Sequence, residues 1–186
     1  MQDVLSRRKF CKYSSLALTG LALPLPSRAG TSPLVKTRRE LSFFNTHTGE
    51  LLECVTYWSR GVYLSDGLEK IDYLLRDHRA NDVTPIDHNL LDTLYLLTRK
   101  LDNNAPLHVI SGYRSRAPNA QLSSQGSGGA KRSLHTQGRA IDIRIPGINL
   151  TELRQTALAL GRGGVGFYPE SQFLHLDTGR ARTWQG

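Results

Sequence analysis

Residues 133–145 decide the fold, and they read Ser-Leu-His-Thr-Gln-Gly-Arg-Ala-Ile-Asp-Ile-Arg-Ile. The alternation of apolar with polar or small residues predicts a β-strand over residues 140–145. Because side chains of a strand alternate between its two faces, the three isoleucines face the core and Asp142 faces the other way. His135 lies in the loop before this strand, and Gly138 lets the chain turn back toward it. The imidazole and the carboxylate can therefore meet at one point.

A second alternating strand is predicted over residues 173–177, which read Phe-Leu-His-Leu-Asp. Its two leucines fill one face, and His175 and Asp177 share the other. Pairing of the two strands could place His175 opposite Asp142. Two histidines and one carboxylate, with a fourth position open to water, form a catalytic zinc arrangement with bonds of about 2.0–2.2 Å. The candidate metal ligands are therefore His135, Asp142 and His175.

Each half of this pattern also has a plain structural interpretation. A single His–Asp pair is commonly a structural hydrogen bond, and His175 by itself reads as a half-buried strand histidine. The two halves together favour the metal site.

The flanking sequence predicts further helices and strands around these two. Two short apolar runs around a glycine-containing turn predict a hairpin over residues 41–58. Other patterns predict a helix over 68–79, a helix over 86–101 capped by Asp87, a strand over 106–110, a short helix over 118–124, a loop over 125–133, a helix over 150–160 begun by Asn149 or Thr151, and a strand over 165–168. Helices come mainly first and strands last. We therefore expect a single α+β domain, with a small central antiparallel sheet flanked by helices and a zinc site on the sheet face.

The first 29 residues are organised as a secretory signal peptide: a basic region, an apolar run over residues 14–25, and small residues before Gly30. The run is too short for a membrane span. Residues 6–10, Ser-Arg-Arg-Lys-Phe, resemble the twin-arginine export signal, the alternative being the basic region of a general secretory signal. We expect a signal peptide over 1–29, a flexible lead-in over 30–38 and a catalytic domain over 39–186. The twin-arginine machinery is then a partner, and the protein is periplasmic or attached to the envelope.

The net charge of the chain indicates which class of polymer it could bind, and its cysteine content bears on disulfide bonding. The formal charge is +8, from 24 basic and 16 acidic residues. Five of the basic residues and one acidic residue lie in the predicted signal peptide, so +4 remains for the exported chain. An anionic envelope polymer fits this charge, whereas no basic run interleaved with aromatics supports nucleic-acid binding. Cys11 lies in the signal peptide, so Cys54 is left without an internal disulfide partner and is expected to be a small buried residue.

The pattern His135-x-x-Gly138-x-Ala140-x-Asp142, followed by His175, resembles the zinc D-Ala-D-Ala peptidases and murein endopeptidases, and within them the YcbK/MepK group of murein endopeptidases. The resemblance covers about residues 39–184 and is visible in residues 41–50, 110–115, 133–143, 163–169 and 173–184. It implies zinc ligands at His135, Asp142 and His175. It also implies a peptidoglycan substrate whose peptide cross-links are cut, including those between two diaminopimelate residues.

The resemblance also bears on the catalytic residues. Arg114, in Ser-Gly-Tyr-Arg-Ser, is similar to an arginine that holds the substrate or stabilises the developing oxyanion, the alternative being a surface turn arginine. Many relatives place a Glu or Asp general base three residues before the last histidine, where this chain has Gln172. Asp177 is the first candidate to replace that base and Glu170 the second. An alternative role for Asp177 is to orient His175 through its other ring nitrogen.

The leading function is therefore a zinc-dependent peptidoglycan endopeptidase of cell-wall growth or remodelling. The alternatives are a D-Ala-D-Ala carboxypeptidase and a catalytically silent peptidoglycan-binding domain, which Gln172 alone favours. The type of cross-link, the oligomeric state and the native metal beyond its ligand type do not follow from the sequence. His108 could approach the site along its strand, and His47, His78 and His88 are expected at the surface or at helix caps.

Overall fold

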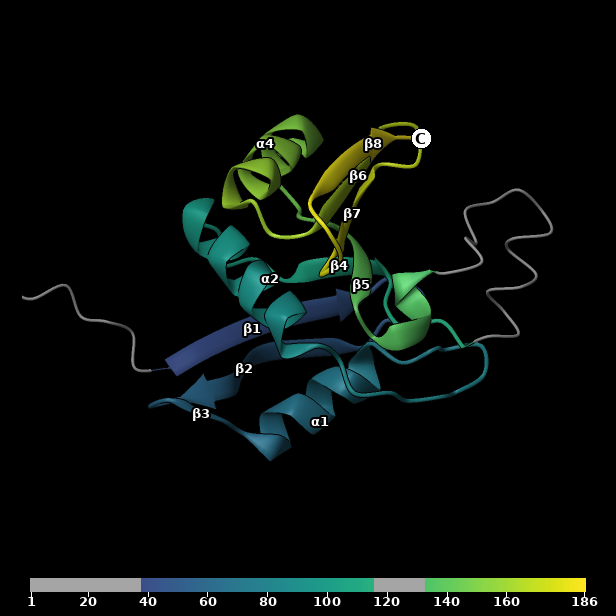
Figure 1. Cartoon of the computed structure of the whole chain (residues 1–186). Coiled ribbons are helices and arrows are strands. Elements are labelled where there is room, and N and C mark those ends of the chain that lie inside the picture. The colour runs from purple at the N-terminus through teal and green to yellow at the C-terminus, as the bar shows by residue number, and fades with distance from the viewer. Residues whose placement is uncertain (1–37, 116–132) are drawn as a thin grey trace, which may run out of the picture. The chain divides into compact units, whose positions relative to one another are not determined.

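A computed structural model describes residues 38–115 and 133–186 (Figure 1). These residues belong to one compact unit, Val35–Gly186. The predicted signal peptide, the predicted helix over 118–124 and nearly all of the loop over 125–133 lie outside the described residues. Within the described ranges, no helix has both the length and the apolar composition needed to cross a membrane.

The described chain contains one eight-stranded sheet with the order β3-β2-β1-β4-β5-β7-β6-β8. Its strands are β1 (Arg38–Asn45), β2 (Leu51–Ser59), β3 (Val62–Tyr63), β4 (Leu107–Ser111), β5 (Ala140–Arg144), β6 (Gly164–Tyr168), β7 (Phe173–Asp177) and β8 (Arg182–Gln185). The predicted hairpin is confirmed as the antiparallel pair β1–β2. The expected α+β class holds, but the expected small antiparallel sheet was wrong. The sheet is large, and it is mixed, because β1–β4 and β6–β8 pair in parallel.

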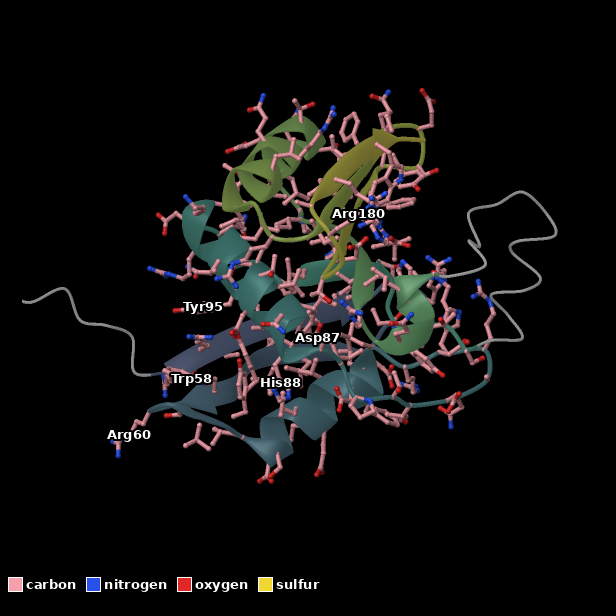
Figure 2. All side chains as sticks on the ribbon, viewed as in Figure 1. Trp58, Arg60, Asp87, His88, Tyr95 and Arg180 are labelled. Atoms are coloured by element: carbon pink, nitrogen blue, oxygen red, sulfur yellow. The ribbon has the colours of Figure 1, made fainter. Side chains whose placement is uncertain are left out.

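Three α-helices lie in the described ranges: α1 (Ser65–Leu74), α2 (His88–Lys100) and α4 (Leu150–Leu160). The last two agree with the predicted helices and caps. Asp87, where α2 begins (Figure 2), accepts a hydrogen bond from the Asn89 N–H at 2.9 Å, and Asn149 accepts one from the Thr151 N–H at 2.8 Å. Helix α1 starts earlier than predicted and ends at Leu74, because the chain then enters a turn closed by the Asp77–Asp82 bridge.

The core lies between the helices and one face of the sheet. Helix α1 packs on β2, α2 on β1 and α4, and α4 on β6 and β7. Fully or almost fully buried members of this core include Phe43, Leu90, Leu94, Ile141, Ile143, Leu153, Leu174 and Leu176. Burial of each such side chain contributes about 1.5–3 kcal/mol. The predicted inward face of β5 is confirmed, so β5 and β7 turn their other faces toward the candidate site.

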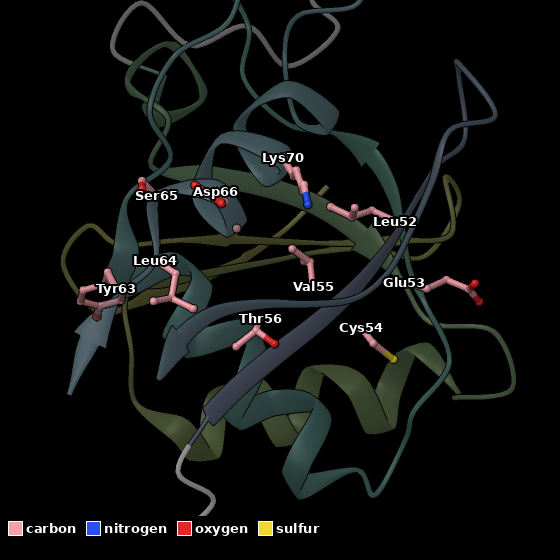
Figure 3. Close-up of a pocket in the computed structure, with 11 residues that line it drawn as sticks. Leu52, Glu53, Cys54, Val55, Thr56, Tyr63, Leu64, Ser65, Asp66 and Lys70 are labelled. Carbon is pink, nitrogen blue, oxygen red and sulfur yellow. The ribbon is translucent and has the colours of Figure 1, made fainter. Parts of the chain in front are cut away.

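Cys54 corrects the prediction of a buried thiol, because it is exposed. Its φ is +48°, and it lies where the register of β2 against β1 shifts. Such a bulge re-aims a side chain, here away from the core. Cys54 lines a cavity of about 540 Å³ between the outer edge of β2 and the start of α1 (Figure 3). None of the predicted site residues lines this cavity.

Candidate metal centre and active site

The candidate centre forms where β5, β7 and the 3₁₀ helix η1 (Leu134–Gln137) meet. In the antiparallel pair β5–β7, Asp142 lies directly opposite His175, as the alternation predicted. His135 comes from η1, and its Nε2 lies 3.3 Å from Asp142 Oδ1 and 3.2 Å from His175 Nδ1. His175 Nδ1 lies 2.8 Å from the same Asp142 oxygen. Three possible ligand atoms therefore converge on one point.

The other ring nitrogen of each histidine has a hydrogen-bond acceptor. His135 Nδ1 donates to the Gly112 carbonyl at 2.7 Å, and His175 Nε2 donates to Asp177 Oδ2 at 3.0 Å. When both imidazoles are neutral, each carries a single N–H, and His135 Nε2 and His175 Nδ1 then keep their lone pairs. Partners of this kind set the tautomer and orientation of metal-binding histidines.

The donor set fits a divalent cation. Two imidazole lone pairs and one carboxylate oxygen face each other, and their separations approach the roughly 3.3–3.6 Å edges of a tetrahedron whose bonds are about 2.0–2.2 Å. The set leaves a fourth position for water or substrate. Nitrogen and oxygen ligands of this kind suit zinc, although they also bind other transition-metal ions.

Burial and mutual attraction shape the ionisation of the three groups. Burial lowers the pKa of His135, so this imidazole is neutral. Burial alone would raise the pKa of Asp142, but His135 and His175 outweigh it and hold that pKa well below its usual value. Burial likewise acts to lower the pKa of His175, but its hydrogen bonds to Asp142 and Asp177 prevail and raise it. A proton and a metal ion compete for the same lone pair of His175.

The side chain of Asp177 is completely buried and its oxygens are fully engaged. Oδ1 accepts from the N–H groups of Gly164 and Gly179, at 3.1 and 2.8 Å. Arg182 donates to Oδ1 at 3.0 Å and to Oδ2 at 2.6 Å. Burial acts to raise the pKa of Asp177, but the hydrogen bonds from His175, Arg182 and the backbone hold it well below its usual value. Asp177 is thus an anchored acceptor for His175.

Two glycines of β6 allow two side chains of β8, Arg182 and Trp184, to reach Asp177 and His175. The parallel register sets Arg182 beside Gly164 and Trp184 beside Gly166, and β7 lies on the other side of β6. A Cβ atom at Gly164 would lie 2.8 Å from Arg182 Cζ, and one at Gly166 would lie 2.6 Å from the Trp184 ring. The side chains of Arg182 and Trp184 therefore cross β6 only because these positions carry no side chain. The sequence prediction missed both residues, and the Gly-Val-Gly spacing inside a strand was the available signal.

Arg114 is held against the centre. Its Nη2 donates to Asp142 Oδ2 at 3.1 Å, and its backbone N–H donates to the His135 carbonyl at 3.2 Å. The residue is only 9% exposed, which is inconsistent with a surface turn arginine. Its Nε is buried and has no hydrogen-bond partner in the described structure. Arg114 therefore lies beside the candidate ligands and contacts one of them directly.

Other candidates from the sequence stay apart from the centre. Gln172 and Glu170 lie in the turn between β6 and β7, where the Gln172 amide donates to the Pro169 carbonyl. His108 packs against Phe44, with ring centroids 5.0 Å apart. Among the described contacts, none joins Gln172, Glu170 or His108 to the three candidate ligands.

An open centre of two histidines and one carboxylate on an α+β sheet is typical of metal-dependent hydrolytic sites. The chain belongs to the peptidase family described as "Peptidoglycan L,D-endopeptidase MepK", whose model matches residues 34–184. It is 42% identical over 179 residues to the peptidoglycan L,D-endopeptidase MepK of Escherichia coli K12, covering 96% of this chain and 97% of that protein. It is 40% identical over 182 residues to the probable peptidoglycan L,D-endopeptidase MepK of Haemophilus influenzae, covering 97% and 96% of the two chains.

Proposed function

We propose that this protein is a zinc-dependent peptidoglycan endopeptidase that hydrolyses peptide cross-links of the bacterial cell wall during growth or remodelling. The observation that carries the proposal is the convergence of two imidazole lone pairs and one carboxylate oxygen from His135, Asp142 and His175. The names of the two relatives, both peptidoglycan L,D-endopeptidases, support peptidoglycan as the substrate and an L,D-bond as the point of cleavage.

Within this proposal, His135, Asp142 and His175 hold the zinc ion. When bound, zinc lowers the pKa of a coordinated water toward roughly 7 and polarises the scissile carbonyl. The chain keeps these ligands ready by fixing both histidine tautomers through Gly112 and Asp177.

Arg114 is proposed to bind the substrate oxygen on which negative charge develops. A guanidinium stays charged and offers several N–H donors in a fixed plane. One of these donors holds Asp142, and the buried Nε has no protein partner within the described chain. A fixed donor at this place stabilises charge that appears during bond cleavage.

Asp177 is proposed to position His175. Full burial of its side chain and five accepted hydrogen bonds support this role over that of general base. Arg182 extends the arrangement, because it holds both oxygens of the carboxylate.

Export is part of the same proposal. Residues 1–29 act as a twin-arginine signal peptide, which delivers the protein to the periplasm or cell envelope. Cell fractionation tests this route. Replacement of Arg7 and Arg8 by lysine should leave the unprocessed protein in the cytoplasm, whereas normal processing would contradict the twin-arginine assignment.

The decisive experiment uses purified sacculi and the mature protein, with and without a chelator, followed by identification of the muropeptides by mass. We expect loss of cross-linked dimers, its block by the chelator and its restoration by zinc. Loss of terminal D-Ala alone would instead identify a carboxypeptidase. Unchanged sacculi with fully zinc-loaded protein would identify a binding domain.

A further inference from the structure

Residues 112–115, which follow β4 and include Arg114, contact the metal centre on one side and the loop after α1 on the other. Toward the centre, the Gly112 carbonyl accepts from His135 Nδ1 at 2.7 Å, and Arg114 donates to Asp142 Oδ2 at 3.1 Å. These contacts hold the segment from one side only. Its position therefore also depends on the contacts that the loop after α1 provides.

The loop after α1 packs closely against the same segment. The Tyr113 N–H donates to the Leu75 carbonyl at 2.8 Å, and the Tyr113 hydroxyl donates to Asp82 Oδ2 at 3.1 Å. A Cβ atom at Gly112 would collide with the Leu75 carbonyl oxygen, so this close approach of two backbones requires glycine. The segment that carries Arg114 therefore cannot move without the loop.

Within this loop, Asp77 is bonded to the residue directly after Arg114. Its Oδ2 accepts from both the N–H and the hydroxyl of Ser115, at 2.8 and 2.9 Å, and its Oδ1 accepts from the Arg79 N–H at 3.0 Å. The backbone of Asp77 is itself held by two hydrogen bonds with the backbone of Asp82, at 2.9 and 3.2 Å. A firmly held carboxylate thus anchors the chain one residue beyond Arg114.

Asp77 is a buried carboxylate without a salt bridge. It is only 2% exposed, and among the described residues no arginine, lysine or histidine side chain forms an ion pair with it. Burial acts to raise its pKa, but the hydrogen bonds from Ser115 and from two backbone N–H groups outweigh it and lower that pKa. Burial lowers the pKa of Arg114, whereas the negative charges of Asp142 and Asp77 act to raise it. The charge of Asp77 therefore favours the ionised guanidinium.

We propose that Asp77 is a positioning residue for Arg114, which it serves by holding the chain at Ser115 so that the guanidinium stays against Asp142. The inference rests on the proposed function, in which Arg114 binds the substrate oxygen that becomes negative. Among the described contacts, none joins Asp77 to the three candidate ligands, so its effect on the reaction passes through residues 112–115. A misplacement of about 1 Å in a group that binds the transition state costs about 100-fold in rate. Loss of Asp77 should therefore affect turnover more than zinc affinity.

The test is a double-mutant cycle on the cleavage of cross-linked muropeptide dimers by zinc-loaded protein. Asp77→Ala should lower kcat about 10–100-fold, with little change in KM or in zinc affinity. In an Arg114→Ala background the same substitution should change kcat less than about twofold, because the group that it displaces is absent. Equal factors in the two backgrounds would overturn the proposal, since a residue that serves the fold alone acts independently of Arg114.

Two further variants separate positioning from a general loss of stability. Asp72→Ala is the matched control, because Asp72 is a partly buried carboxylate of α1 that accepts from the Ile86 N–H at 2.9 Å, away from residues 112–115. It should lower Tm and leave kcat unchanged, and an equal loss of kcat in this control would contradict the role of Asp77. Asp77→Asn keeps one acceptor oxygen for Ser115 and should retain part of the turnover. It replaces Asp77→Ala in the cycle if the alanine variant is not folded at the assay temperature.

NMR of the Arg114 Nε–H distinguishes failure of this inference from failure of the proposed function. Its signal, assigned by its absence in Arg114→Lys, should exchange slowly with water in the zinc-loaded wild type, because that nitrogen is buried. In Asp77→Asn the exchange should be about tenfold faster. Unchanged exchange would overturn the positioning role. Faster exchange in the variant, together with no cleavage by the wild type, would overturn the proposed function and leave the link between Asp77 and Arg114 standing.

Discussion

Arg182 of β8 holds Asp177 of β7 by two hydrogen bonds, at 3.0 and 2.6 Å, although β6 lies between the two strands. The contact extends a chain of hydrogen bonds from Arg182 through Asp177 to His175. Residues that orient a metal ligand affect metal affinity without touching the metal. The edge strand β8 is thereby coupled to the candidate centre.

Replacement of Arg182 should weaken this coupling. We expect Arg182→Met to lower zinc affinity about 10–100-fold, because Asp177 loses two donors and holds His175 less firmly. Zinc affinity is measured by competition with a chromophoric chelator at a temperature where the variant is fully folded. Arg182→Lys, which keeps one charged donor, should recover part of the loss. A lower Tm with unchanged zinc affinity would show that Arg182 serves the fold alone.

The Trp184 side chain crosses β6 at Gly166, so we expect a larger residue at position 166 to be destabilising. A Cβ atom there would lie 2.6 Å from the Trp184 ring, so Gly166→Ala should displace that ring and destabilise the protein by about 1–3 kcal/mol. Denaturant unfolding measures this cost. In a Trp184→Ala background the added methyl group has space, so the same substitution should cost much less. Equal costs in the two backgrounds would mean that the clash with Trp184 is not the cause.

Metal removal should reveal the role of His175 in stability. A ligand that binds only the folded state raises Tm, so zinc should stabilise the wild type and a chelator should reverse the effect. His175→Ala should lose both the zinc-dependent rise in Tm and peptidoglycan cleavage. Gln172→Asn, in the turn just before β7, should retain both the zinc-dependent rise in Tm and the cleavage. The Gln172 side chain is hydrogen-bonded to the Pro169 carbonyl and not to the candidate ligands. Retained turnover in His175→Ala would disprove its assignment as a ligand.

Asp87 joins the start of α2 to the end of β7. It accepts from the Asn89 N–H at 2.9 Å and from the Thr178 hydroxyl at 2.6 Å. Burial acts to raise its pKa, but these hydrogen bonds outweigh it and lower the pKa in the folded state. Its stabilising contribution is therefore complete above the unfolded pKa of about 3.9 and is lost as the pH falls through the folded value.

Asp87→Ala should accordingly cost about 1–2 kcal/mol of unfolding free energy at pH 7. The difference from wild type should shrink as the pH falls below about 4, because the wild-type carboxyl then becomes protonated. Urea unfolding at several pH values gives both quantities. A difference that stays constant down to low pH would show that the charge of Asp87 does not contribute.

Local patterns accounted for much of the centre. Alternation in β5 and β7 placed the isoleucines and leucines in the core and predicted that Asp142 and His175 face each other, because the direction of a strand side chain depends only on its position along the strand. The start of α2 could also be predicted, because an N-cap residue is recognised within a few residues of sequence.

Other features depend on residues far apart in the chain. The parallel pairs β1–β4 and β6–β8 join distant segments, and β8 buries too little apolar surface to have a clear period. The two possible roles of Asp177 could not be separated until Arg182 and two backbone N–H groups were seen to occupy its oxygens. The sequence by itself determined that Asp142 and His175 face away from the core and toward each other, because the direction of a strand side chain follows from strand period. Only the tertiary structure decided the size of the sheet, the partners that set the histidine tautomers and the contribution of β8, because these arise from contacts between segments that no local pattern connects.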